Sequence, residues 1–172
     1  MGTPGTIIRP AELSDLDLLQ AVIQRAYRGR SAAASWSHEG ELPEGERVSR
    51  GDLEALLGAT DARLSVAEIA GQIVGSSLVV AVVPGECEIR LVSVDPSVQG
   101  EGLGSQLLGH AEALAGGIFA ASHATIEVLQ HKSRLIAYYE RRGYRRTEGS
   151  RPYPHPLKMP ARFLKFRKDL RP

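Results

Sequence analysis

Three glycines at alternate positions, Gly100, Gly102 and Gly104, give the sequence its clearest chemical signature. They follow an expected strand that ends at Val94, and they precede an apolar stretch typical of a helix. Glycines let the backbone approach a ligand closely, and the start of a helix favours an anion such as phosphate. The loop has neither the Gly-Lys-Ser/Thr ending of an NTP-binding loop nor the G-x-G-x-x-G spacing of a dinucleotide loop. It therefore predicts a phosphate-bearing ligand of another kind.

Other residue types that commonly do chemistry give weaker signals. The single cysteine, Cys87, cannot form an internal disulfide or a Cys-x-x-Cys metal site. Its place in an expected strand indicates a small buried side chain rather than a nucleophile. The five histidines, at positions 38, 110, 123, 131 and 155, show no metal-ligand spacing with cysteine or carboxylates, so the sequence predicts no metal.

The composition is that of an ordinary globular chain of 172 residues, with 42% hydrophobic and 24% charged residues. It predicts one domain over residues 1–172, with a core from about residue 6 to residue 168. The formal net charge of +1 is too small for a protein that binds many phosphates, so we expect no nucleic-acid partner. The longest apolar stretch, residues 78–83, is far shorter than the about 20 residues of a membrane span. Because the N-terminus also lacks a signal-peptide pattern, we expect a soluble, cytoplasmic protein without a membrane partner.

Hydrophobic periodicity predicts one strand and two helices in the first third of the chain. Thr6–Arg9 has the pattern of a short strand, and Ser14 and Asp15 are suitable caps for the helix that follows. A weaker pattern around Leu53 predicts a second helix after an irregular loop over residues 29–45. The apolar residues of the first helix recur at spacings of three and four: Leu18, Leu19, Val22, Ile23, Ala26 and Tyr27.

From Arg63 onward the period changes to two, which is typical of strands. Short spacers separate three such runs, so we expect an antiparallel meander. The glycine loop then leads into a helix that Gly116 and Gly117 are expected to end, and Gly143 is expected to close a later helix. The predicted strands are Leu64–Ile69, Ile73–Val83, Cys87–Val94, Ala124–Leu129, Arg145–Thr147 and Phe163–Arg167, and the later helix is Leu135–Arg142.

Two segments together resemble a known family. Gln99-x-x-Gly102-x-Gly104, after a strand and before an apolar helix, resembles the acetyl-CoA motif of the Gcn5-related N-acetyltransferases (GNAT). Leu135–Tyr144, with its Tyr-Tyr pair and Gly-Tyr ending, is similar to a later helix of that family, in the same order along the chain. The resemblance covers most of the chain, from about Thr6 to Thr147. It implies a single α/β domain in which helices flank a mixed, mostly antiparallel sheet.

The resemblance also implies that the co-substrate is acetyl-CoA. Its pantetheine arm would lie between two strands that splay apart, one ending at Val94 and the other around Glu127. Lys132 stands where the family often has an asparagine, and its ammonium would either reach a CoA phosphate or be solvated. Backbone groups of Val92, Ser93 and Val94 would pair with the pantetheine amides. The residues expected around the pyrophosphate are Gln99, Gly100, Glu101, Gly102, Leu103, Gly104 and Ser105.

Two side chains are candidates for the acid–base chemistry. An amine with a pKa of about 10.4 must lose a proton before it attacks, which costs about 4.6 kcal/mol at pH 7. By resemblance, Glu127 is the candidate general base, with a solvated strand carboxylate as the alternative. Tyr139 matches the family tyrosine that lies near the thioester sulfur and protonates the departing thiolate. A role as a core aromatic is the alternative for Tyr139 and the favoured interpretation for Tyr138.

The resemblance places acceptor recognition in two segments, residues 31–45 and 151–160. In the first of them, Trp36, His38 and Glu39 offer an apolar surface, an ionisable ring and a carboxylate, which suit a small cationic amine. A loop anchored by one tryptophan is the alternative.

The sequence thus predicts an N-acetyltransferase that moves the acetyl group from acetyl-CoA directly to a primary amine, with a small-molecule amine as the expected acceptor. Two alternatives stay open: a non-catalytic acyl-CoA-binding module, and an enzyme that acetylates a protein N-terminus or lysine. Relatives often form a homodimer, although no exposed apolar stripe in this sequence indicates one.

Overall fold

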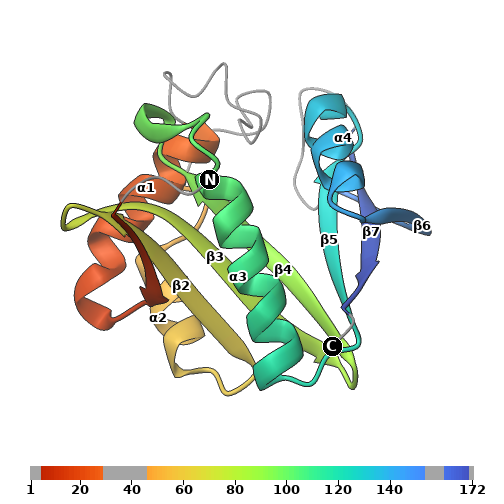
Figure 1. Cartoon of the computed structure of the whole chain (residues 1–172), viewed down its shortest axis with the longest axis horizontal. Helices are drawn as coiled ribbons and strands as arrows, with labels where there is room; N and C mark the ends of the chain where they lie inside the picture. The colour runs from red at the N-terminus through yellow and green to blue at the C-terminus, as the bar shows by residue number, and fades with distance from the viewer. Residues whose placement is uncertain (1–4, 29–45, 154–160, 171–172) are drawn as a thin grey trace.

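A seven-stranded sheet with helices on both faces organises the computed structural model, which describes residues 5–28, 46–153 and 161–170 (Figure 1). The strand order is β1-β2-β3-β4-β5-β7-β6, and all neighbours are antiparallel except β4 and β5. This arrangement confirms the expected mixed, mostly antiparallel α/β fold. The strands are β1 (Thr6–Pro10), β2 (Ala62–Ile69), β3 (Gln72–Val83), β4 (Glu86–Val94), β5 (His123–Leu129), β6 (Arg145–Pro152) and β7 (Arg162–Asp169). The helices are α1 (Leu16–Arg28), α2 (Arg50–Gly58), α3 (Leu103–Ile118) and α4 (Ser133–Arg141), with 3-10 turns η1 (Leu13–Asp15) and η3 (Pro96–Val98).

Apolar side chains on both faces of the sheet explain why helices cover both. In Figure 1, α3 crosses in front of β3 and β4. The face under α1 and α2 buries Leu16, Leu19, Ile23, Leu53, Leu64, Val66 and Leu78. The face under α3 and α4 buries Val79, Ile89, Leu108, Ala111, Ile126, Val128, Tyr139, Tyr144 and Phe166.

Three local predictions were wrong. Leu18 is 60% exposed, because the buried stripe of α1 begins at Leu16 and continues through Leu19. Gly116 and Gly117 do not end α3, which continues to Ile118. Strand β6 extends to Pro152, well past the predicted end at Thr147, because its residues are mostly exposed and pair with β7 alone, so they carry no apolar alternation.

Strands β4 and β5 are paired only at one end. Their parallel register runs from Glu86 opposite His123 to Glu88 opposite Thr125, and Figure 1 shows the strands separating beyond it. At the paired end, the Glu86 carboxylate accepts a hydrogen bond from Lys165 Nζ at 2.7 Å and lies 3.0 Å from His123 Nε2. Beyond it, β4 contains an irregularity at which Leu91 adopts a φ of 48°. These features confirm the splayed strands that the resemblance implied.

Gly75 allows β3 and β4 to approach each other beside the separated ends. A Cβ at this position would lie 2.7 Å from the carbonyl oxygen of Ser93 and 2.9 Å from Cδ1 of Leu107. We expect Gly75→Ala to lower the free energy of unfolding by about 1–3 kcal/mol, since a backbone atom must shift. Gly116→Ala is the matched control, because its Cβ would meet nothing within 4 Å and helical alanine stabilises by up to about 1 kcal/mol. Urea unfolding measures both, and equal stabilities of the two variants would contradict the prediction.

Candidate active site

The glycine loop and the two helices that follow it surround a cavity of about 790 Å³, here called the cofactor cavity. Gly100 and Gly102 have φ values of 90° and 80°, in the left-handed region that favours glycine. The carbonyl of Gly102 accepts the first hydrogen bonds of α3, from the amides of Ser105 and Gln106. The predicted cofactor residues that line this cavity are Val92, Val94, Gln99, Gly100, Gly102, Leu103, Gly104, Ser105 and Tyr139. Three others are absent from its lining: Ser93, Glu101 and Lys132.

Asp95 fixes the loop to the rest of the fold. One carboxylate oxygen accepts hydrogen bonds from the amide and hydroxyl of Ser97, at 3.0 and 2.8 Å. The other accepts two from the guanidinium of Arg25 on α1, at 2.9 and 2.6 Å. Burial opposes ionisation of Asp95, but these hydrogen bonds outweigh it and lower the pKa of the carboxyl group. Sequence reasoning missed this contact, since Arg25 lies seventy positions before its partner.

The hydroxyl of Tyr138 faces the cofactor cavity. It lies 3.2 Å from Oγ of Ser105, and the guanidinium of Arg142 lies 4.7 Å from the centre of its ring. Arg142 also donates a hydrogen bond to Oγ of Ser105. The expectation that Tyr138 is a core residue therefore holds only in part. The residue packs against the hydrophobic core, but it also lines the cofactor cavity.

A second cavity of about 290 Å³, here called the acceptor cavity, lies on the side of α1 and α2. Tyr27 contributes its ring to this lining, and its hydroxyl donates a hydrogen bond to the carbonyl of Val92 at 3.3 Å. The two cavities share three lining residues: Val92, Leu135 and Tyr139. They therefore adjoin each other at these residues, beside the part of β4 that is not paired with β5.

Tyr139 occupies this meeting point. Its ring packs edge-to-face on Tyr138 and Tyr144, and only 8% of the residue is exposed. Burial, together with the neighbouring hydroxyls of Tyr27 and Tyr138, raises the pKa of Tyr139. The phenol consequently stays protonated at neutral pH.

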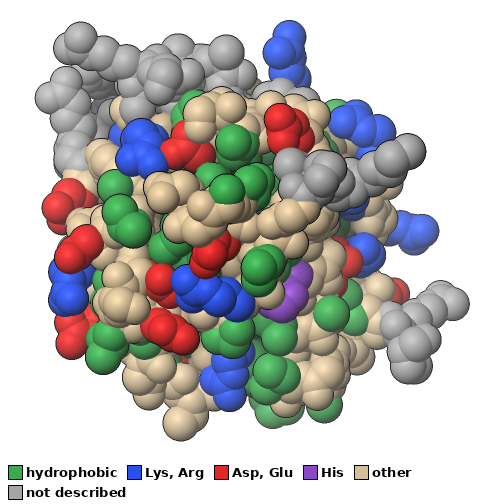
Figure 2. Space-filling model, turned by 60° about the vertical axis from the view of Figure 1, so that its left-hand side comes forward, with side chains coloured by type: hydrophobic (Ala, Val, Ile, Leu, Met, Phe, Trp, Pro, Cys, Tyr) green, Lys and Arg blue, Asp and Glu red, His purple; other side chains and the backbone are tan. Residues whose placement is uncertain are grey.

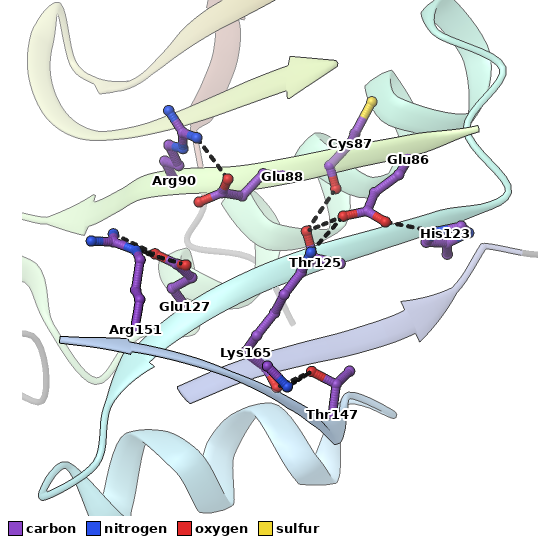
Figure 3. Close-up of polar contacts among 11 residues, drawn as sticks. Glu86, Cys87, Glu88, Arg90, His123, Thr125, Glu127, Thr147, Arg151 and Lys165 are labelled. Carbon is purple, nitrogen blue, oxygen red and sulfur yellow. Dashed lines mark hydrogen bonds and ion pairs between the residues drawn. The ribbon is translucent and has the colours of Figure 1, made fainter. Parts of the chain in front are cut away.

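Glu127 lies on β5 in the lining of the acceptor cavity, and both of its carboxylate oxygens accept hydrogen bonds from Arg151. The pair is partly exposed, at 21% for the Glu127 side chain and 49% for that of Arg151. Glu88 and Arg90 of β4 form a second ion pair nearby, at 2.6 Å. Figure 3 shows both pairs at the same end of the strands, away from the contact between Glu86 and His123. Sequence reasoning gave no role to Arg90, and it placed Arg151 only at the start of a segment expected to contribute to acceptor recognition.

The other predicted residues lie outside the cofactor cavity or outside the part of the chain that the structure describes. Lys132, which was expected either to reach a CoA phosphate or to be solvated, lines the acceptor cavity. Trp36, His38 and Glu39 lie outside the described residues. Cys87 is fully buried as expected, and burial raises the pKa of its thiol.

Charge on the surface is mixed. Acidic and basic side chains are interspersed on the face shown in Figure 2, as the net charge of +1 would suggest. Within residues 5–28, 46–153 and 161–170, no group of three or more His, Cys, Asp or Glu side chains could hold a metal ion. In the same ranges, no helix has both the length and the apolar character needed to cross a membrane.

Comparison with known proteins identifies this arrangement. An N-acetyltransferase from Staphylococcus aureus Mu50 superposes with a TM-score of 0.74 at 16% identity, covering 96% of this chain and 99% of that one. The ribosomal-protein-S18-alanine N-acetyltransferase from Escherichia coli gives 0.73 at 17%, covering 96% and 94%. A GNAT family acetyltransferase from Elizabethkingia anophelis with acetyl-CoA bound gives 0.68 at 18%, covering 98% and 100%. No curated protein matches the chain in sequence.

These likenesses establish the fold. The family itself is established by the acetyltransferase (GNAT) domain, which matches residues 60–146, just over half of the chain. That match includes the glycine loop, Glu127 and Tyr139. The chain therefore belongs to the GNAT family and is an acetyl-CoA-dependent N-acetyltransferase.

Proposed function

We propose that this enzyme transfers the acetyl group directly to the primary amine of a small molecule, within a ternary complex. The observation that supports this most strongly is that Val92, Leu135 and Tyr139 line both cavities, so that the two cavities adjoin each other there. A thioester from one side and an amine from the other would come together there. The acceptor cavity, at about 290 Å³, lies at the small end of the range for small-molecule sites, which favours such an acceptor over a protein segment.

The cofactor would occupy the larger cavity. Amides at the start of α3 suit the pyrophosphate, because the helix dipole and the first-turn N–H groups favour an anion. The guanidinium of Arg142, beside Ser105, adds positive charge to the same lining. Main-chain groups of Val92 and Val94 would bind the pantetheine arm along the separated edge of β4.

The chemistry would proceed by direct attack. The amine nitrogen forms a bond to the acetyl carbon, and the bond between that carbon and sulfur breaks. The ammonium group loses one proton through Glu127 to solvent before the attack. Tyr139 donates its phenol proton to the departing CoA thiolate, and the phenolate then takes up the second proton that the nitrogen loses, which restores Tyr139. A covalent route through Cys87 is disfavoured, because a buried thiol with a raised pKa is a poor nucleophile.

Calorimetric titration with acetyl-CoA, CoA and ATP tests the cofactor, and thiol release with a panel of amines, amino acids and peptides tests the acceptor. We expect acetyl-CoA to bind, ATP not to compete with it, and small amines to release CoA. Turnover with peptides alone would favour a protein acceptor, as in the enzyme from Escherichia coli that acts on a ribosomal protein alanine. Binding without turnover on any amine would contradict the proposal.

Removing the carboxylate of Glu127 tests its role as the base. Glu127→Gln keeps the shape of the side chain, so we expect kcat to fall by about 100-fold while the KM for acetyl-CoA stays within twofold. The pH profile of kcat should also change shape, because the proton acceptor is lost. Glu148→Gln, which alters an exposed glutamate of β6, is the matched control and should behave as the wild type. An unchanged rate and pH profile for Glu127→Gln would remove Glu127 from the mechanism.

A further inference from the structure

Two ion pairs lie together at the acceptor cavity, and each of them contributes one residue, Arg90 or Glu127, to the cavity lining. Glu88 and Arg90 come from β4, Glu127 from β5 and Arg151 from β6 (Figure 3). The two ion pairs also interact with each other, since Glu127 is among the groups that raise the pKa of Arg90. An acid and a base therefore stand next to each other at the open end of β4 and β5. A ligand that carries one positive and one negative group would complement this arrangement of an acidic and a basic side chain.

The Arg90 guanidinium has N–H groups with which it could bind the negative group of such a ligand. Its one hydrogen bond among the described residues joins Nη2 to Glu88, whereas a guanidinium carries five N–H donors. Its side chain is 48% exposed and contributes to the cavity lining. Planar guanidinium groups bind carboxylates through paired hydrogen bonds, which fixes the orientation of the ligand as well as its position. Arg90 also lies only two residues before Val92, where the cavities meet.

Apolar residues complete the cavity. Its lining also includes aliphatic side chains from α2, β3, β4 and β5, which would suit an apolar group on the ligand. These residues are Leu56, Leu78, Leu91, Val128 and Leu129.

We propose that the acceptor is an α-amino acid with an apolar side chain, or a close analogue, whose carboxylate binds Arg90 and whose amine lies beside Glu127. This inference rests on the proposed function and narrows its acceptor to a zwitterion. It also differs from the cationic amine that the sequence suggested, because it uses the charges of the described walls.

The test compares leucine, methionine and phenylalanine with their amides and with their decarboxylated amines. In the wild type, kcat/KM for the free amino acids should exceed that for the other two series by at least about tenfold, since hydrogen bonds to charged groups are the stronger ones. Arg90→Gln should lower kcat/KM for the amino acids by at least about tenfold and change the decarboxylated amines by less than about twofold. Arg90→Lys, which keeps the charge, should retain part of the preference.

Two controls separate this inference from the proposed function. Acetyl-CoA affinity, measured by calorimetry, should be equal in the wild type and both Arg90 variants. Arg145→Gln, which alters an exposed arginine outside the cavity lining, should leave the preference intact. If amides or decarboxylated amines react as well as the amino acids, or if Arg90→Gln slows all three series equally, the zwitterion assignment is wrong while the acetyltransferase stands. If acetyl-CoA itself fails to bind, both proposals fall.

Discussion

Gly104→Phe should abolish measurable acetyl-CoA binding, with a loss of affinity greater than about 100-fold. A Cβ at this position would lie 3.8 Å from Cγ2 of Val94 and 3.9 Å from the hydroxyl of Tyr138, and all three residues line the cofactor cavity. If the cofactor binds as proposed, with its pyrophosphate at the start of α3 and its pantetheine arm along β4, a phenyl group attached there would occupy space that the cofactor needs. Burial of that arm and its hydrogen bonds to the backbone would be lost together, and each 1.4 kcal/mol is worth a tenfold change in affinity.

Gly104→Ala is the matched control for this prediction. Its methyl group makes only ordinary van der Waals contacts, and alanine favours the helical conformation that α3 already has there. We expect its acetyl-CoA affinity to stay within about threefold of the wild type by calorimetry. Gly102 is less suitable for the experiment, because its φ of 80° would add backbone strain to any substitution. A folded Gly104→Phe variant that binds acetyl-CoA normally would place the cofactor elsewhere.

Tyr139→Phe should lower kcat by about 100-fold and leave the KM for acetyl-CoA nearly unchanged. The change removes only the hydroxyl, at the point where the two cavities meet. Since burial and neighbouring hydroxyls raise the pKa of Tyr139, the phenol is protonated below that raised pKa and supplies a proton throughout the neutral range. We therefore expect no loss of wild-type activity between about pH 7 and 9 from ionisation of this group. Steady-state kinetics across this range measure both effects.

The neighbouring tyrosines are the controls. Tyr144→Phe removes a buried hydroxyl that donates to Glu112 at 3.0 Å, and Tyr144 lines neither cavity, so stability should fall by about 1 kcal/mol while kcat is preserved. Tyr138→Phe alters the hydroxyl beside Ser105 and should weaken cofactor binding without a large change in kcat. A 100-fold fall in kcat for Tyr138→Phe, with normal kinetics for Tyr139→Phe, would transfer the acid role to Tyr138.

Local patterns were enough to predict most of the fold. Period-two runs with short spacers defined the antiparallel meander, and the alternate glycines between a strand and a helix marked the cofactor cavity. Strand β6 was predicted too short because an exposed edge strand needs no apolar alternation, and its Arg-Arg-Thr-Glu sequence carries none. The helix through Gly116 and Gly117 shows that packing of the whole helix can outweigh two weak helix formers.

The side-chain partners in the site could not be predicted in the same way. Glu127 was identified by family resemblance, but its ion pair with Arg151 joins β5 to β6, which are not neighbours in the sheet because β7 lies between them. Arg90 had no sequence signal, because an arginine in a strand is ordinary until β5 separates from β4 beside it. Tyr27 had the periodicity of a buried helical residue, and only the tertiary structure brings its hydroxyl to Val92. Contacts of this kind depend on three-dimensional arrangement, which periodicity does not encode.

The short pairing between β4 and β5 has a consequence for inhibition. Because the strands are joined only from Glu86 to Glu88, the backbone leaves an opening in the sheet beyond that pairing, and the two cavities proposed for the substrates adjoin each other beside it. A single compound that links the sulfur of CoA to the nitrogen of an acceptor would thread through this opening and fill both cavities at once. Its second half would bind at the high effective concentration set by the first, so it should inhibit far more strongly than either half alone. A sheet whose strands stayed paired along their whole length would leave no path for such a molecule.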